Sequence, residues 1–264
     1  MAEPSDGTQF TLLGADTALE HPALAAHYSY PADPRSPWVR ANMIASLDGA
    51  ATTGGRSGGL GGSGDRAVFQ TLRELADVIV VGANTVRIEN YSGAQSGAGQ
   101  RAARQRRGQT EVPPIAVLTR TGRLARDARL FTRTEVPPLV LTCTDAVADT
   151  RSRIGDLAEV LDASADRPDS VDLPTALALL AERGLVRVLA EGGPAILGAF
   201  LAAGLIDELC LTLAPVLVGG PSARILSGPT EAPTGMTPRA PLTDADGYLY
   251  LRYVRGDDGG DAGQ

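Results

Sequence analysis

The sequence predicts an α/β protein in which helices cover both faces of one central sheet. Short, continuously apolar segments alternate along the chain with segments of helical periodicity. Strands that are apolar throughout are typical of sheets buried on both sides. The 264 residues contain neither an internal repeat nor a long interior linker, so we expect one main domain at 37–255. An N-terminal arm at 1–36 would precede it, and a disordered tail at 256–264 would follow.

The first half of the chain is predicted to form the arm, two strands and two helices. Proline and small polar residues indicate an extended arm, which Tyr28, Tyr30 and Trp38 would anchor. Apolar residues at helical spacing support the longer helix. In order, we expect a strand at Trp38–Ser46, a glycine-rich loop at Ala50–Gly64, a helix at Asp65–Leu75, a strand at Val78–Val81 and a short helix at Asn84–Glu89. The polar, arginine-rich segment 91–111 is expected to be a surface loop.

The second half continues the alternation of strands and helices. A proline near the start of each of two helices fits the first helical turn, and Gly184 would end the first of them. We expect strands at Ile115–Leu118, Leu139–Leu141, Leu157–Leu161 and Val186–Ala190, helices at Leu173–Arg183 and Pro194–Ala203, and final strands at Glu208–Leu213 and Tyr248–Val254. These final two strands are expected to run antiparallel to the rest.

The composition excludes several functional classes. The formal net charge is −7, which is unfavourable for binding a nucleic-acid backbone. Two scattered cysteines form neither a disulfide framework nor a zinc motif, and His21 and His27 are the sole histidines, so we expect no metal site and no fused zinc deaminase. The sequence holds no apolar run of membrane-spanning length, and its N-terminus is acidic and polar. We therefore expect a soluble, cytoplasmic protein that binds neither nucleic acid nor membrane.

Three turns that follow apolar strands are suited to phosphate. Gly192 and Gly193 would let a ligand approach the backbone, and the helix starting at Pro194 offers unpaired N–H groups. The other two turns contain Gly82, Thr85 and Arg87, and Thr119 with Arg120, which could select a 2′-phosphate. Each turn alone is also compatible with an ordinary strand–helix connection or a solvated arginine. Because the carboxyl ends of strands meet at one edge, a single dinucleotide could touch all three.

The segment Gly59–Gly64 matches the pattern G-x-G-x-x-G but is not interpreted as a dinucleotide-binding motif. Such a motif follows its strand directly, whereas here about a dozen residues separate it from the strand ending at Ser46. We expect a flexible loop, which could close over a substrate and exclude water.

Polar residues near the end of the first strand indicate a substrate site. Asn42 and Ser46 share one side of this strand, and Asp48 lies in the turn that follows. Asp65 opens the next helix. It is either the N-cap of that helix or a carboxylate in an apolar cleft that accepts hydrogen bonds from an aminopyrimidine, in which case burial would raise its pKa.

An ordered set of short motifs resembles the RibD C-terminal domain family, the reductase domain of bacterial riboflavin biosynthesis. The motifs are Asn42–Gly49, Leu72–Arg87, Ala190–Pro194, Gly204–Leu209 and Leu213–Gly220. The resemblance implies a dihydrofolate-reductase-like three-layer fold with helices on both faces of a mostly parallel mixed sheet of about nine strands and antiparallel C-terminal strands. It also implies NADPH as hydride donor, a pyrimidine substrate and a homodimer.

The resemblance extends to individual residues. Cofactor contacts are expected at Gly82, Thr85, Val86, Thr119, Arg120, Glu191, Gly192, Gly193, Pro194 and Ala195, and Arg87 joins them as a charge in the second turn. Asn42, Ser46, Asp48 and Asp65 would surround the substrate, with Asp65 as the catalytic residue that holds the ring. The implied reaction is reduction of 5-amino-6-(5-phosphoribosylamino)uracil.

One segment departs from the family. Many members continue after the second turn with Asp-Asn-Pro-x-Leu-Thr, which helps to hold the ribosyl phosphate, whereas this chain has Ile88–Gly93 with a different pattern. The arginines Arg101, Arg104, Arg106 and Arg107 could bind phosphate instead, or form a solvated basic loop. The departure leaves two alternatives open: reduction of dihydrofolate or another pterin on the same fold, and a protein that binds NADPH without turnover.

Overall fold

The computed structural model of the chain describes residues 10–12, 18–19, 21–32 and 37–256. Its strands are β1 (Phe10–Leu12), β2 (Ala18–Leu19), β3 (Trp38–Ser46), β4 (Val78–Gly82), β5 (Ile115–Leu118), β6 (Leu139–Thr142), β7 (Glu159–Asp162), β8 (Arg187–Ala190), β9 (Glu208–Ala214), β10 (Met236–Thr243) and β11 (Leu249–Arg255). Its helices are α1 (His21–His27), α2 (Ser63–Leu75), α3 (Ala83–Ile88), α4 (Ala98–Arg106), α5 (Arg129–Thr132), α6 (Thr144–Ile154), α7 (Leu173–Ala181) and α8 (Pro194–Ala202), with a 3₁₀ turn at Ser57–Gly59.

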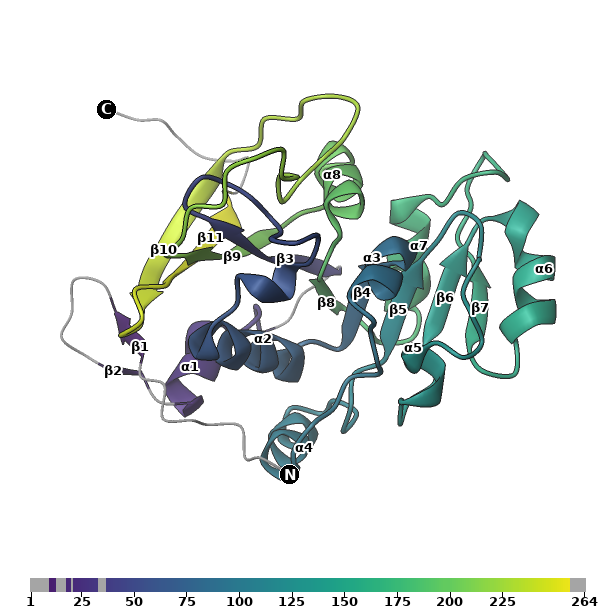
Figure 1. Cartoon of the computed structure of the whole chain (residues 1–264). Helices are drawn as coiled ribbons and strands as arrows, with labels where there is room; N and C mark the ends of the chain where they lie inside the picture. The colour runs from purple at the N-terminus through teal and green to yellow at the C-terminus, as the bar shows by residue number, and fades with distance from the viewer. Residues whose placement is uncertain (1–9, 13–17, 20, 33–36, 257–264) are drawn as a thin grey trace.

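All of these strands join one twisted sheet, which runs across the molecule in Figure 1 in the order β2-β1-β10-β11-β9-β3-β8-β4-β5-β6-β7. The strands from β9 to β7 in this order are parallel, and β11, β10, β1 and β2 add antiparallel strands at one side. The predicted antiparallel direction is therefore confirmed for the strand at Tyr248–Val254. It is wrong for the strand at Glu208–Leu213, because β9 pairs in parallel with β3.

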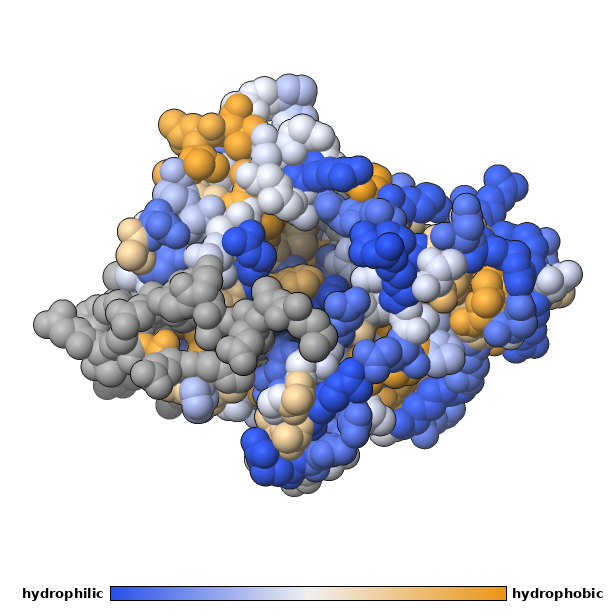
Figure 2. Space-filling view, turned by 60° about the horizontal axis from the view of Figure 1, so that its bottom comes forward, coloured by the Kyte–Doolittle hydropathy of each residue, from blue (hydrophilic) through white to orange (hydrophobic). Residues whose placement is uncertain are grey.

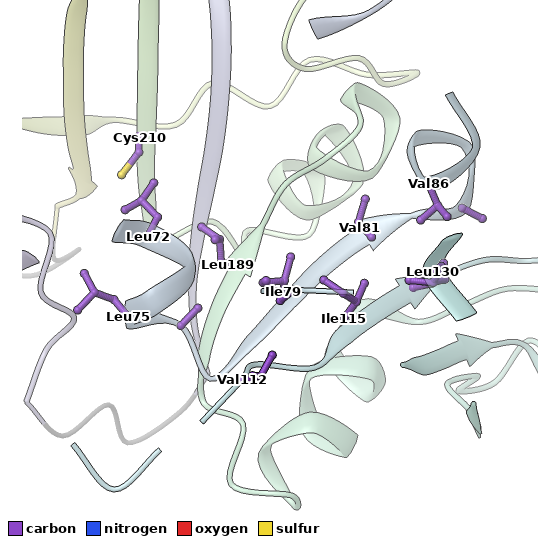
Figure 3. Packing of buried hydrophobic residues seen from close by; sticks show 14 of the residues in the cluster. Leu72, Leu75, Ile79, Val81, Val86, Val112, Ile115, Leu130, Leu189 and Cys210 are labelled. Atoms are coloured by element: carbon purple, nitrogen blue, oxygen red, sulfur yellow. The ribbon is translucent and has the colours of Figure 1, made fainter. Parts of the chain in front are cut away.

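Both faces of the sheet are buried, as the continuously apolar strands predict. In β4, Ile79 and Val81 pack into one core and Val78 and Val80 into the other. The first core is closed by α1, α2, α3, α5 and α6, and the second by α7 and α8. Figure 3 shows Leu72 of α2 beside the strands of the first core. The three-layer α/β architecture follows from this division.

The arm is helical in part, which corrects the prediction of an extended segment. Residues 21–27 form α1, which packs against α2 and buries Leu24. Tyr28 and Tyr30 are buried as anchors, and the Tyr30 hydroxyl donates a hydrogen bond to the Val188 carbonyl at 3.2 Å. Most other arm residues lie outside the described part of the chain, as does the predicted tail beyond Gly256.

The arginine-rich segment 91–111 is not a loop, because α4 forms within it. Arg104 is fully buried, and its guanidinium donates to the carbonyls of Glu74 at 2.8 Å, Ala76 at 2.6 Å and Thr110 at 2.6 Å. The carbonyls at the end of α2 have no partner within their own helix, so Arg104 caps that helix from outside. Burial lowers the pKa of Arg104 to about 10.

We expect Arg104→Met to lower the free energy of unfolding by about 2–4 kcal/mol, because several buried carbonyls lose their donor. Urea unfolding measures this loss. The matched control is Arg106→Met on the same helix, whose side chain is exposed and which should stay within about 0.5 kcal/mol of the parent. Equal effects of the two substitutions would contradict the capping role.

Besides α1 and α4, the strands and α-helices of the described residues that the sequence did not predict are β1, β2, α5, α6 and β10. In α6 the buried residues are Thr150 and Ile154, so the helix carries no apolar stripe. β10 contains Pro238 and Pro241 and is largely exposed, which masks its strand character in the sequence. Among the described residues, no helix is both long and apolar enough to cross a bilayer.

Candidate active site

The carboxyl ends of four neighbouring parallel strands, β3, β8, β4 and β5, form the site. β8 pairs with β3 on one side and with β4 on the other, so the turns that follow these strands meet at one edge. Two cavities lie there, of about 320 Å³ and 460 Å³. We call them the Asp65 cavity and the Arg120 cavity after one residue of each. Their linings share Asn84, Thr85, Gly193 and Pro194, so the cavities adjoin.

The Arg120 cavity collects most residues of the three predicted phosphate turns. Its lining includes Gly82, Thr85, Thr119, Arg120, Gly193, Pro194 and Ala195. The sequence did not indicate two further lining residues, Ala223 and Ser227, which come from the long segment between β9 and β10. The Ser227 N–H donates to the Pro194 carbonyl at 3.0 Å and holds that segment against the start of α8.

The glycines of these turns are required by close packing. Gly192 has φ +82°, in the left-handed region, and its peptide bond to Gly193 is cis. A Cβ atom at Gly193 would lie 2.6 Å from the Thr85 hydroxyl oxygen, and one at Gly82 would lie 2.7 Å from Ile196. The Gly82 N–H also donates to the Gly192 carbonyl at 2.8 Å, so two of the turns are joined through their backbones.

The start of α8 presents unpaired backbone donors to the Arg120 cavity. The Leu197 N–H donates to the Gly193 carbonyl, and the preceding residues Ala195 and Ile196 line the cavity. The first N–H groups of a helix have no partner within it and favour an anion. Together with the exposed Arg120 side chain, this arrangement fits the phosphates of a dinucleotide.

Four of the predicted cofactor residues do not line the Arg120 cavity. Val86 is buried in the core, and Gly192 lines neither cavity. The Arg87 guanidinium donates to the Arg123 carbonyl at 3.2 Å and to Asn84 Oδ1 at 3.3 Å. Glu191 lines the Asp65 cavity instead. The other seven predicted cofactor residues line the Arg120 cavity and are therefore the ones placed to contact a ligand there.

Asp65 lies in the first turn of α2, at the wall of its cavity. The N-cap of this helix is Gly62, so the interpretation of Asp65 as N-cap is wrong. Burial raises the pKa of Asp65, against the opposite effects of a hydrogen bond from the Thr212 hydroxyl and of the Arg66 charge. A carboxyl group of this kind can hold a proton at a higher pH than an exposed one.

The rest of the Asp65 cavity is largely apolar with a few polar groups. The lining also contains Asn42, Met43, Ile44, Ala51, Thr52, Gly55, Ser57, Gly58, Arg66, Phe69, Asn84, Thr85, Ile88, Glu89, Tyr91, Glu191, Gly193 and Pro194. The sequence indicated Asn42 but missed Arg66, Phe69, Glu89 and Tyr91. Helical periodicity could have indicated Phe69, which lies one turn after Asp65 on α2.

Ser46 and Asp48 lie outside both linings. The Ser46 hydroxyl donates to Asp48 and accepts from the Ala50 N–H at 2.9 Å. Asp48 also accepts from the N–H groups of Val218 at 3.1 Å and Gly219 at 2.6 Å. These hydrogen bonds, with that from Ser46 the strongest influence, lower the pKa of Asp48 to about 2. The pair thus fastens the turn after β3 to the segment after β9.

Residues of the glycine-rich loop form part of the lining of the Asp65 cavity. The backbone N–H and hydroxyl of Ser57 donate to Glu89 at 2.9 Å and 3.0 Å, so the loop is tied to the far end of α3. A Cβ atom at Gly62 would lie 2.9 Å from the Tyr248 ring, and one at Gly64 would collide with the Tyr250 hydroxyl. Close packing against Tyr248 and against Tyr250 of β11 therefore accounts for Gly62 and Gly64 without a nucleotide.

The fold and cavities define an α/β protein with a two-part ligand cleft at the carboxyl edge of its parallel strands, where such sheets bind nucleotides. The model of the RibD C-terminal domain matches residues 37–249, and the chain belongs to this family. The expected dihydrofolate-reductase-like fold is thereby confirmed.

Three similar proteins carry names that describe riboflavin biosynthesis or a pyrimidine reductase. The riboflavin biosynthesis protein RibD of Bacillus amyloliquefaciens is 31% identical over 73% of this chain, which spans 49% of that protein. A 2,5-diamino-6-ribosylamino-4(3H)-pyrimidinone 5′-phosphate reductase of Archaeoglobus fulgidus is 28% identical over 70% of this chain and 83% of its own length. A solved pyrimidine reductase-like protein of Corynebacterium diphtheriae is 29% identical, with a TM-score of 0.75 over 84% of this chain and 93% of its own.

Proposed function

We propose that the chain is an NADPH-dependent pyrimidine reductase of riboflavin synthesis that acts on 5-amino-6-(5-phosphoribosylamino)uracil or a close relative. The observation that carries the proposal is the junction of the two cavities at Asn84, Thr85, Gly193 and Pro194. A dinucleotide in the Arg120 cavity would end at this junction, next to a ring held in the Asp65 cavity. The names of two relatives support the proposal, because one describes riboflavin biosynthesis and the other describes the reduction of a related ribosylamino-pyrimidine phosphate.

The residues of the Arg120 cavity fit NADPH. The first turn of α8 would hold the pyrophosphate, the glycines leave the backbone accessible, and Arg120 would contact the 2′-phosphate. When bound, NADPH supplies the hydride for reduction of the ribose C1′. The protein contributes by orienting the two reactants in contact, which is a large part of what such enzymes do.

The Asp65 cavity supplies the polar contacts for the substrate. Asp65 would pair with the N–H groups of the pyrimidine, and its raised pKa suits it to hold the proton that accompanies hydride transfer. The loop tied to Glu89 would shield the site from water.

The test is NADPH oxidation by the purified chain, followed by absorbance with the ribosylamino-pyrimidine phosphate and with dihydrofolate in parallel. Turnover of the pyrimidine is the expected result. NADPH binding without reduction of either compound would refute the proposal and indicate a non-catalytic NADPH-binding protein.

A specific observation favours a second candidate, the reduction of dihydrofolate or another pterin. Among the described residues that line the Asp65 cavity, Arg66 is the one cation, beside three carboxylates. None of the four arginines proposed from the segment 91–111 lines this cavity. Arg104 is buried, Arg101 pairs with Glu111 and Glu135, Arg107 pairs with Glu74, and Arg106 is exposed outside the lining. A substrate without a phosphate would suit this lining. Turnover of dihydrofolate, with no turnover of the pyrimidine, would establish this second candidate function.

Replacement of Arg120 by Ala is expected to raise the Kd for NADPH about tenfold and to leave the Kd for NADH unchanged. The reason is that one charge-assisted contact to the 2′-phosphate is lost. Fluorescence titration with both cofactors measures the two constants. Arg129→Ala, an exposed arginine outside both cavities, serves as control. An equal change for both cofactors would oppose this role of Arg120.

We also propose a homodimer in the cytoplasm. Leu47, Val216 and Leu217 are exposed by 57%, 42% and 77%, and the Leu47 N–H donates to the Val216 carbonyl, so these apolar side chains belong to adjacent segments. On the face shown in Figure 2, apolar residues gather in separate groups among hydrophilic ones. The exposed apolar patch formed by Leu47, Val216 and Leu217 suits a protein interface. A monomeric mass in light scattering would oppose the dimer.

A further inference from the structure

We propose that Arg73 and Tyr91 are positioning residues that fix the Glu191 carboxylate as a hydrogen-bond acceptor on the wall of the Asp65 cavity. The bound substrate would meet this carboxylate with an N–H or O–H group. The inference rests on the proposed function, because it assigns the substrate to this cavity.

The geometry around Glu191 is a clamp with three short hydrogen bonds. Glu191 follows β8 directly, and its side chain is 2% exposed. The Arg73 Nε donates to Oε1 at 2.7 Å and Nη2 donates to Oε2 at 2.7 Å, which is the bidentate arrangement of arginine and carboxylate. The Tyr91 hydroxyl donates to Oε2, also at 2.7 Å. The position of the carboxylate is therefore set from two separate parts of the chain.

The two donors are themselves held in place. The Arg73 guanidinium lies 4.2 Å from the centre of the Phe69 ring and 5.6 Å from that of Tyr91. Although burial opposes the charge of Arg73, the neighbouring Glu191 outweighs it and raises the guanidinium pKa. Burial, and then Glu191, raise the pKa of Tyr91, so its hydroxyl stays protonated and donates. The Tyr91 N–H also donates to the Val86 carbonyl at 3.0 Å.

The clamp leaves acceptor capacity for a ligand. Oε2 receives two of the donors and Oε1 receives one, whereas an ionised carboxylate has about four acceptor sites. Glu191 and Tyr91 both line the cavity, and Arg73 does not. A neutral donor of the substrate, such as a sugar hydroxyl or a ring amino group, can use the remaining site, whereas an anionic group would be repelled.

The cavity thus holds two carboxylates in different environments. Glu191 is paired with a guanidinium, whereas Asp65 receives the neutral Thr212 hydroxyl and is raised in pKa by burial. Pairs of this kind divide the roles of acid and fixed electrostatic partner in many sites. Tyr91 belongs to the segment Ile88–Gly93, where the sequence departs from the family pattern, so part of the clamp comes from that segment.

The test compares Tyr91→Phe, which keeps the ring and removes the hydroxyl, with Arg73→Lys, which keeps the charge and removes the fork. For each, KM and kcat for the pyrimidine, its Kd in the presence of NADP⁺, the Kd of NADPH and the unfolding temperature are measured. We expect KM and the pyrimidine Kd to rise about fivefold to tenfold in Tyr91→Phe and more in Arg73→Lys, with the NADPH Kd nearly unchanged.

Arg107→Lys is the matched control, because it alters another arginine–glutamate pair that α2 makes, with Glu74, outside the cavity. A merely structural clamp would lower the unfolding temperature of the variants and leave the pyrimidine Kd unchanged. Unchanged Kd values in Tyr91→Phe, with a parent protein that reduces the pyrimidine, would overturn the inference alone. A parent that neither binds nor reduces the pyrimidine would overturn both the inference and the proposed function.

Discussion

Replacement of Asp65 by Asn is expected to lower kcat about 10²-fold to 10⁴-fold, the usual contribution of a group that handles a proton. The amide has nearly the shape of the carboxyl but cannot release or take up the proton. Asp65 does not line the Arg120 cavity, so the NADPH Kd should stay within about twofold. Steady-state kinetics and fluorescence titration measure the two quantities. Turnover of Asp65→Asn at the parental rate would show that Asp65 has no catalytic role.

The same substitution should raise the stability of the protein at neutral pH. Burial raises the pKa of Asp65 above its unfolded value, so the folded state holds the proton more tightly. The stabilising contribution of this group is present at low pH and is lost as pH rises through the folded pKa. Urea unfolding should show Asp65→Asn above the parent at neutral pH, with the difference closing in acid. Asp156→Asn, at an exposed ion pair with Arg126, is the control and should not show this gain.

Replacement of Gly193 by Val is expected to raise the NADPH Kd by about 100-fold or more. The added Cβ would lie 2.6 Å from the Thr85 hydroxyl oxygen, and the further methyl groups would project where the two cavities meet. Backbone that approaches a ligand closely leaves no space for a side chain. Titration of NADPH into the variant measures the loss.

The matched control is Gly235→Val, where an added Cβ would meet no atom within 4 Å. It should bind NADPH like the parent and unfold at nearly the same temperature. Circular dichroism of Gly193→Val must show a folded protein. Parental NADPH affinity in a folded Gly193→Val would refute the phosphate role of this turn.

The sequence predicted those strands and helices whose own residues form an apolar pattern. The strands at Val78–Gly82 and Arg187–Ala190 are short and, apart from Arg187, apolar throughout, as expected where both faces of a sheet are covered. The helix α4 lacks such a signal, because Arg104 is buried through hydrogen bonds to the end of another helix. A non-local partner of this kind is invisible to periodicity.

The sequence predicted the part of the candidate site that depends on the backbone of the turns after the parallel strands. The turns at Gly82 and Gly193 meet at one cleft because their strands are neighbours in a parallel sheet. Ser46 and Asp48 lie near the predicted substrate site, but their side chains make other contacts. Ser46 donates to Asp48, and Asp48 accepts from the Val218 N–H in the segment after β9. Tyr91 was missed because its role depends on Glu191, which lies far away in the sequence.

The shared wall of the two cavities connects the binding of the two ligands. Asn84, Thr85, Gly193 and Pro194 contribute to both linings, so a ligand in one cavity touches the residues that the other ligand must meet. Any factor by which one ligand changes the affinity of the other is reciprocal, since the free energies form a closed cycle. If the two reactants bind as proposed, the wall that brings them together would also be the place where their binding cooperativity, positive or negative, arises.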